Sequence, residues 1–221
     1  MLRVLACAAG ATAAAGAVAA PEQVRLSLTH ATSAMHVFWA TNNETTPADY
    51  AGVVQWGEMT PTNEAAAVTS TYSIFGYQAS RLHNAVMSPL TESTIYFYRV
   101  GSERDGWSQT FNFSTAPPAG TYPVKFCAYG DMGILNSQNT AALTAKMIRD
   151  GDAQFIVHAG DISYADDRPD AVYEAVQDAF YNEVQASSAY APYMLSSGNQ
   201  CVGVPRGRVH ARASTARRAA R

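Results

Sequence analysis

The sequence predicts two folded parts of different class: a fibronectin- or immunoglobulin-like β-sandwich over residues 21–116, followed by the first part of an α/β domain over residues 123–199. Two observations support this division. Short segments rich in β-forming residues fill the first part, whereas buried strands alternate with amphipathic helices in the second. A chain of 221 residues with 48% hydrophobic and 15% charged side chains has enough apolar material for both.

Residues 1–20 are typical of a signal peptide, with Arg3 followed by an Ala-rich apolar stretch that ends at Ala20. A membrane anchor is the alternative, but the stretch is shorter than the roughly 20 residues that a span requires. We therefore expect a secreted, extracellular protein. In that setting Asn43 and Asn112 are glycosylation candidates, because each begins an Asn-x-Ser/Thr sequence.

The sandwich is predicted from strand signals that recur at short intervals and are separated by turn residues. About seven short strands in roughly 95 residues are typical of this architecture. The clearest signals lie at residues 24–28, 35–40, 52–56, 83–87 and 94–100. Residues 117–122, with two prolines and a glycine, then form a short linker.

After the linker, residues 124–128 are predicted to form a buried strand, and residues 136–149 a helix that Asn136 or Ser137 caps and Gly151 ends. The expected apolar face of this helix comprises Ala141, Leu143, Ala145, Met147 and Ile148.

A second buried strand is expected at residues 155–159, a second helix at 170–185 and a third strand at 193–196. The inward side chains of the second helix are expected to be Val172, Val176, Ala179 and Phe180. Right-handed crossovers between successive strands make the three strands parallel.

A polar side chain follows each strand next to a glycine: Asp131, Asp161 and Asn199. Parallel strands bring these side chains to one carboxyl edge of the sheet, where open α/β folds bind ligands. The phenol of Tyr164 lies three residues after Asp161. Such oxygen donors suit Fe(III), Mn(II) or Zn(II), so the sequence predicts a metal site.

These motifs resemble those of the purple acid phosphatases, which are calcineurin-like metallophosphoesterases. The stretch 130–133 is similar to the family's G-D-x-G, 160–164 to its G-D-x-x-Y, and Gly198-Asn199 to the start of its G-N-H-E. Residues 21–28, 96–101 and 107–113 also resemble the family's N-terminal sandwich. The resemblance extends over about residues 21–199.

The resemblance implies an acid phosphatase that hydrolyses phosphate monoesters at a dinuclear centre of Fe(III) and a divalent Zn, Mn or Fe ion. It implies that Asp131 and Tyr164 bind the ferric ion, that Asp161 bridges both ions and that Asn199 binds the divalent ion. Tyrosinate bound to iron gives the family its purple colour.

The chain departs from the family pattern directly after Asn199, where Gln200-Cys201 replaces His-Glu. No catalytic residue is therefore predicted, because glutamine cannot supply a titrating proton. The later histidine motifs of the family have no counterpart in residues 202–221, so we expect weak or no metal binding. A noncatalytic product with a β-sandwich binding module is the alternative function.

The last 22 residues, 200–221, contain six arginines and no acidic residue, unlike the rest of the chain. We interpret them as the product of a shifted reading frame; a genuine basic tail is the alternative. The first 200 residues carry nine basic and all 18 acidic side chains, which gives no reason to expect nucleic acid or a membrane as partner. The expected partner is a phosphate monoester.

Other reactive side chains are assigned structural roles. His158 is expected to be a hydrogen-bonded core histidine that points away from the site, and Cys127 a small buried residue. His30, His36 and His83 are expected at the surface of the sandwich or partly buried in it. Asp166 and Asp167 are expected to solvate a loop or cap a helix near Pro169.

Overall fold

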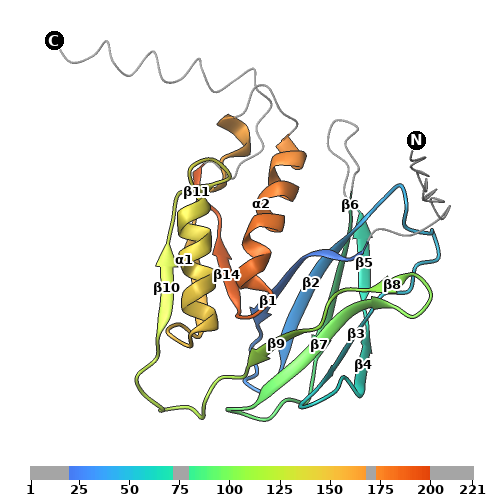
Figure 1. The fold of residues 1–221 in the computed structure, drawn as a ribbon, viewed down its shortest axis with the longest axis horizontal. Helices are drawn as coiled ribbons and strands as arrows, with labels where there is room; N and C mark the ends of the chain where they lie inside the picture. Colours follow the sequence, from blue (N-terminus) through green and yellow to red (C-terminus); the bar gives the residue numbers. More distant parts are fainter. Residues whose placement is uncertain (1–19, 72–79, 168–172, 200–221) are drawn as a thin grey trace, which may run out of the picture.

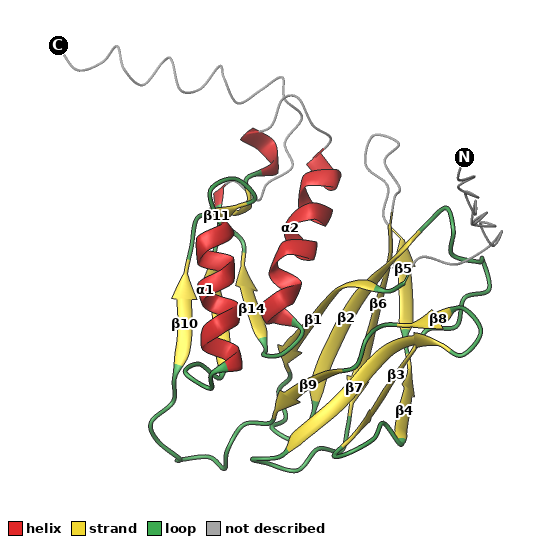
Figure 2. Ribbon diagram, in the orientation of Figure 1, coloured by secondary structure: helices red, strands yellow, loops and turns green. Residues whose placement is uncertain are grey.

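The computed structural model describes residues 20–71, 80–167 and 173–199. The predicted signal peptide, residues 1–20, lies outside these ranges except for Ala20, and so do the basic tail from Gln200 onward, Val172 and Pro169. Within them, an all-β part and a part with helices and a parallel sheet lie side by side (Figures 1 and 2).

The first part is a sandwich of two antiparallel sheets, which confirms the predicted class. One sheet has the order β1-β2-β6-β5, with β1 at Glu22–Leu28, β2 at Met35–Asn42, β6 at Ser80–Met87 and β5 at Val68–Thr71. The other has the order β4-β3-β7-β8, with β4 at Asn63–Ala66, β3 at Val53–Gly57, β7 at Ile95–Ser102 and β8 at Gly106–Trp107. Strand β9 (Phe111–Ser114) also pairs with β7.

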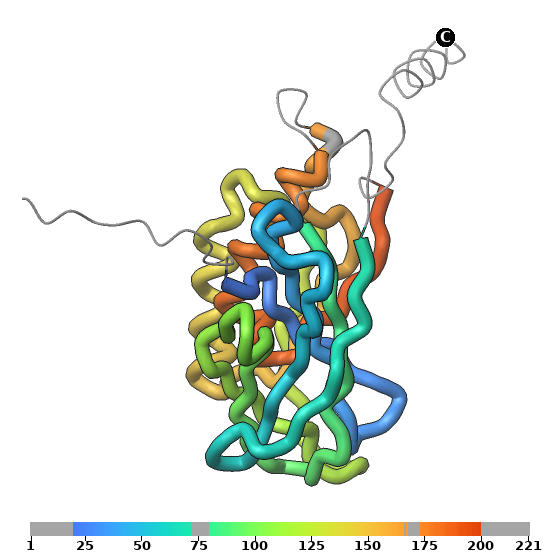
Figure 3. The backbone as a smooth tube through the Cα atoms, turned by 90° about the vertical axis from the view of Figure 1, so that its right-hand side faces the viewer, coloured from blue at the N-terminus to red at the C-terminus, as the bar shows by residue number. Residues whose placement is uncertain are grey.

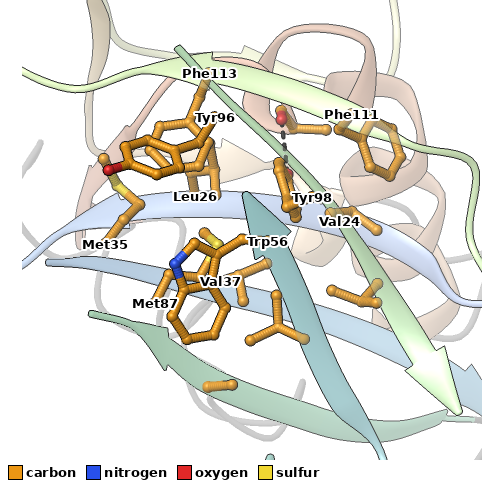
Figure 4. Close-up of a cluster of buried hydrophobic side chains, with 14 of the residues drawn as sticks. Val24, Leu26, Met35, Val37, Trp56, Met87, Tyr96, Tyr98, Phe111 and Phe113 are labelled. Atoms are coloured by element: carbon orange, nitrogen blue, oxygen red, sulfur yellow. Dashed lines mark hydrogen bonds between the residues drawn. The ribbon is translucent and has the colours of Figure 1, made fainter. Parts of the chain in front are cut away.

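The sandwich core consists of the side chains that alternate inward from the two sheets (Figure 4). Aromatic rings contribute much of it: Tyr98 lies 5.5 Å from Phe111 and 5.7 Å from Phe113 between ring centroids. Other members are Val24, Leu26, Met35, Val37, Trp39, Val54, Trp56, Met87, Tyr96 and Val100.

Strands β4 and β5 were not among the segments that the sequence singled out. All four residues of β5 are exposed and β4 has none buried, so neither carries the apolar alternation on which strand prediction depends. Pairing with β3 and β6 holds them in the sheets instead.

His83 is fully buried, which corrects the expectation that it lies at the surface or is only partly buried. Its two ring nitrogens each lie 2.9 Å from a threonine hydroxyl, those of Thr41 and Thr69. The ring also stacks on Trp39 at 5.4 Å. Burial, assisted by the charge of Arg81, lowers the pKa of His83 to about 4, so the ring is neutral in the folded protein near neutral pH.

The second part is a three-stranded parallel sheet of order β10-β12-β14, as predicted. The strands are β10 at Phe126–Tyr129, β12 at Phe155–Ala159 and β14 at Tyr193–Ser196, joined through α1 at Gln138–Arg149 and α2 at Tyr173–Ser188. Two further short strands, β11 (Met132–Gly133) and β13 (Ile162–Ser163), pair beyond the sheet, and a 3₁₀ turn spans Ala165–Asp167. Neither helix in the described part of the chain has the length and apolar character of a membrane span.

The two helices cover only one face of this sheet, and the core lies beneath them. It contains Cys127, Ile156 and Tyr193 from the strands and Phe180 and Val184 from α2. On the opposite face the rings of Phe126 and Phe155 stack at 5.1 Å, and Phe126 is 51% exposed. The buried strand predicted at 124–128 is therefore buried only on the face that the helices cover, and it spans Phe126–Tyr129.

Two details of α1 differ from the predictions. Leu143, expected inward, is 58% exposed, because the contact face of α1 centres on Ala145 with Ala141 and Ile148 beside it. Ser137 occupies the N-cap position, but its hydroxyl donates to Glu183 of α2 instead of capping the helix. Gly151, with φ of +75°, follows the helix as expected.

Strand β1 and helix α2 join the two parts (Figure 3). The backbone N–H of Val24 donates to the Gln185 side chain at 2.7 Å, and the Ser188 hydroxyl donates to the Val24 carbonyl at 3.1 Å. Fully buried Tyr98 of β7 donates its hydroxyl to the Ala189 carbonyl at 2.7 Å (Figure 4). Backbone and core contacts thus fix the orientation of the α/β part against the sandwich.

We expect the free energy of unfolding to fall as the pH falls from about 6.5 to about 4, because the unfolded chain then binds a proton that the buried His83 does not. The slope from this residue approaches ~1.4 kcal/mol per pH unit. The measurement is urea unfolding of wild type and His83→Gln across this pH range. His30→Gln, which removes an exposed histidine, is the control. Equal slopes for wild type and His83→Gln would contradict the assignment.

Candidate functional site

The carboxyl ends of the parallel strands bring the predicted site residues to one edge of the sheet. Asp131 lies two residues after β10, Asp161 two residues after β12 and Asn199 three residues after β14. The backbone N–H of Asp131 donates to the Gly160 carbonyl at 3.2 Å, which joins the first two strand ends directly. The structure therefore places Asp131 and Asp161 on adjacent segments, as the sequence predicted.

The backbone of this edge has a left-handed conformation at four non-glycine residues. The φ angles are +54° at Asp131, +48° at Asp161, +67° at Ser163 and +52° at Tyr164. Such conformations cost on the order of 1 kcal/mol each and persist only where surrounding contacts impose them. This concentration of strain was not visible in the sequence, although the neighbouring Gly-Asp pairs indicated sharp turns.

Tyr164 reaches back across the edge to the first strand end. Its hydroxyl donates a hydrogen bond of 2.9 Å to Oδ1 of Asp131. This hydrogen bond is the main reason that the pKa of Tyr164 is raised to about 12, with smaller contributions from desolvation and the Asp131 charge. The phenol and the carboxylate, 33 positions apart in the sequence, thus face one another.

Asp161 is nearly buried and lies against the backbone of Gly198. A Cβ atom at Gly198 would lie 2.1 Å from Oδ1 and 2.2 Å from the backbone nitrogen of Asp161. Only glycine therefore allows the segment after β14 to approach this carboxylate. The next residue, Asn199, is exposed.

The donor atoms gathered here fit a hard cation, since carboxylate, phenol and amide oxygens are the ligands that such ions prefer. Tyr164 and Asp131 already lie within contact distance, and Asp161 enters from the adjacent segment. Among the residues that the structure describes, no group of three or more His, Cys, Asp or Glu side chains could hold a metal ion.

His158 lies beneath this edge, on the helix-covered face of the sheet, as the sequence predicted. It is fully buried, and Nδ1 lies 2.7 Å from the Tyr193 hydroxyl. Burial lowers the pKa of His158, while the Asp131 charge and the neighbouring backbone of Asp161 and Gly160 partly oppose this effect. Within the described ranges, Nε2 has no hydrogen-bond partner.

The other residues that the sequence analysis singled out lie away from this edge or have structural roles. Cys127 is buried, as predicted, and burial raises the pKa of its thiol. Asp166 and Asp167 belong to the 3₁₀ turn, where Asp167 is exposed. In the sandwich, Asn112 is exposed on β9, whereas Asn43 accepts a hydrogen bond from Arg81 at 3.0 Å.

The described residues thus form a β-sandwich followed by a parallel sheet that carries acidic residues at its strand ends, in the place where open α/β sheets bind ligands. Comparison with known proteins shows which family the chain resembles. Residues 21–115 match the family described as "Purple acid Phosphatase, N-terminal domain". This match confirms the predicted resemblance of the sandwich to the N-terminal part of purple acid phosphatases.

The similarity extends beyond the sandwich. The chain is 31% identical to purple acid phosphatase 5 of Arabidopsis thaliana over 186 residues, which cover 81% of this chain and 45% of the relative. Acid phosphatase type 7 of Danio rerio is 29% identical over 81% of this chain and 39% of its own length. The chain thus spans less than half the length of these curated relatives.

A solved purple acid phosphatase from yellow lupin seeds has the same fold over the matched region. It superimposes with a TM-score of 0.65 at 23% identity and covers 81% of this chain and 35% of its own length. This likeness supports the order of a β-sandwich followed by the start of an α/β part.

We expect Gly198→Ala to move the segment that carries Asn199 away from Asp161, because the added methyl group has no space. Overpacking of this kind costs about 1–3 kcal/mol. The measurement is chemical unfolding together with backbone amide NMR shifts at residues 160–163. Ser197→Ala, an exposed neighbour, is the control, and equal unfolding midpoints for both variants would show that the close approach does not exist.

Proposed function

We propose that this chain carries the first part of the dinuclear metal centre of a phosphomonoester hydrolase, formed by Asp131, Asp161, Tyr164 and Asn199. One contact carries the assignment: the Tyr164 hydroxyl meets the Asp131 carboxylate at the sheet edge that Asp161 and Asn199 also reach. The names of the relatives support the reaction class, since they are acid phosphatases.

In this proposal Asp131 and Tyr164 would hold Fe(III), Asp161 would serve both ions, and Asn199 would hold the divalent ion, which is Zn, Mn or Fe. A relative from Arabidopsis thaliana, 31% identical over 62% of this chain, is named Fe(3+)-Zn(2+) purple acid phosphatase 12. When bound, such a metal pair activates water and neutralises the charge on phosphate oxygens.

The protein's own residues prepare the site for cations in two ways. The Tyr164 phenol keeps its proton because it donates to Asp131, and these two oxygens would lose that proton when they hold a cation. Asp161 is turned toward the edge by a left-handed backbone and confined by Gly198, so its carboxylate has little freedom to leave.

The same proposal limits what this chain does by itself. Gln200 stands at the position of the family's histidine and provides no proton donor that titrates in the working range. The chain therefore contributes the sandwich, the sheet edge and part of the ligand set, and it catalyses little hydrolysis by itself.

We further propose that residues 1–20 direct secretion and that residues 21–116 and 123–199 form the two domains. Of the two glycosylation candidates, exposed Asn112 is the better acceptor.

We expect purified chain to hold fewer than two metal ions after dialysis and to hydrolyse p-nitrophenyl phosphate at least ~100-fold more slowly than full-length purple acid phosphatase 5, because a proton donor and further ligands are missing. The measurements are elemental analysis and a rate assay. Asp131→Asn is the control, since it should remove residual metal binding without altering the sandwich. Two tightly held ions and a rate equal to that of the relative would contradict this expectation.

The proposed shift of reading frame after Asn199 is tested by sequencing the transcript across the codons for Ser197 to Arg221. We expect an alternative frame to encode His-Glu directly after Asn199, followed by histidine motifs. A transcript that encodes Gln200-Cys201 and the arginine-rich residues without an alternative frame would make the basic tail genuine, and the sandwich would then be the part to assay for binding.

A further inference from the structure

Each of the three parallel strands carries a buried or half-buried polar ring a few residues before its proposed ligand. Tyr129 comes two residues before Asp131, His158 three before Asp161 and Tyr193 six before Asn199. Tyr129 pairs in register with His158 across β10 and β12. All three side chains lie on the face that α1 and α2 cover, with Tyr129 and His158 nearest the strained edge and Tyr193 at the start of β14.

The three rings contact one another. His158 Nδ1 and the Tyr193 hydroxyl are 2.7 Å apart, and the His158 and Tyr129 ring centroids are 5.1 Å apart. Burial raises the pKa of Tyr129, an effect that hydrogen bonding to Tyr193 and to Thr144 of α1 partly offsets. Phe180 of α2 packs on His158 at 5.9 Å. The cluster therefore connects all three strands with both helices.

A short chain of backbone hydrogen bonds leads from this cluster to the site. The Gly160 N–H donates to the His158 carbonyl, and the Asp131 N–H donates to the Gly160 carbonyl, both at 3.2 Å. Asp131 and Asp161, at the end of this chain, have left-handed backbones. Since such backbone strain persists only where neighbours impose it, the residue beneath them must itself be fixed.

We propose that Tyr129, His158 and Tyr193 form a positioning cluster that holds the three strand ends in the arrangement from which Asp131 and Asp161 present their carboxylates. They are positioning residues, because they act through the backbone of the strand ends and not on a ligand. The effect on metal binding rests on the proposed function, whereas the effect on the strand ends does not.

The first test compares Tyr193→Phe with Tyr98→Phe by backbone amide hydrogen exchange of the metal-free protein. Each variant deletes one buried hydroxyl and its hydrogen bond, but Tyr98 bonds to Ala189 at the domain junction, before β14 begins. We expect exchange at Gly160 and Asp131 to become about tenfold faster in Tyr193→Phe than in Tyr98→Phe, because only the first loosens the cluster.

The second test measures Zn²⁺ binding by calorimetry for wild type and both variants. We expect Tyr193→Phe to weaken Zn²⁺ binding by about tenfold or more relative to Tyr98→Phe, as is usual when support for a ligand is removed. Faster exchange at the edge in Tyr193→Phe with equal Zn²⁺ binding by the two variants would support the cluster and contradict the proposed role of this edge in metal binding. Equal exchange at Gly160 and Asp131 in the two variants would overturn the positioning cluster, whatever the Zn²⁺ result.

Discussion

The packing of α2 against β1 is the contact on which the rest of this molecule depends. The backbone of β1 forms hydrogen bonds with two side chains near the end of α2. From the opposite sheet, Tyr98 donates a hydrogen bond to the residue that follows α2. Strand β14 begins directly after this junction, where the Ile156 N–H donates to the Pro192 carbonyl and Leu26 bridges to Pro192. The sandwich thereby sets the position of the parallel sheet. The sheet in turn sets the positions of the residues at its carboxyl edge.

The edge combines polar side chains with backbone strain, and the two have a common origin. Where the backbone turns directly after a buried strand and an aspartate points outward, the backbone adopts left-handed conformations. Residues other than glycine rarely adopt these conformations. The glycines relieve part of this strain: Gly160 has φ of +82°, and Gly198 lets two segments meet. The remaining strain falls on Asp131, Asp161, Ser163 and Tyr164, and the buried rings beneath them offer the rigid support that it requires.

Much of this arrangement could be predicted from the sequence, because it depends on local patterns. The alternation of β1, β2 and β7, the three apolar strands followed by polar residues and the parallel topology are all consequences of periodicity and connection rules. His83, Leu143 and Phe126 could not be placed correctly, since their burial depends on neighbours distant in the sequence. The hydrogen bond between Tyr164 and Asp131 likewise required the fold, which alone brings position 164 to position 131.

The uncovered face of the parallel sheet affects how this protein behaves in solution. Phe126 and Phe155 form an apolar ridge there, with Val157 beside Met194 on the next strand, and neither α1 nor α2 covers it. Two molecules that bring such ridges together remove them from water, a gain in free energy that needs no specific fit. Such association increases with protein concentration, so the tendency of this protein to self-associate depends on a surface that α1 and α2 leave uncovered.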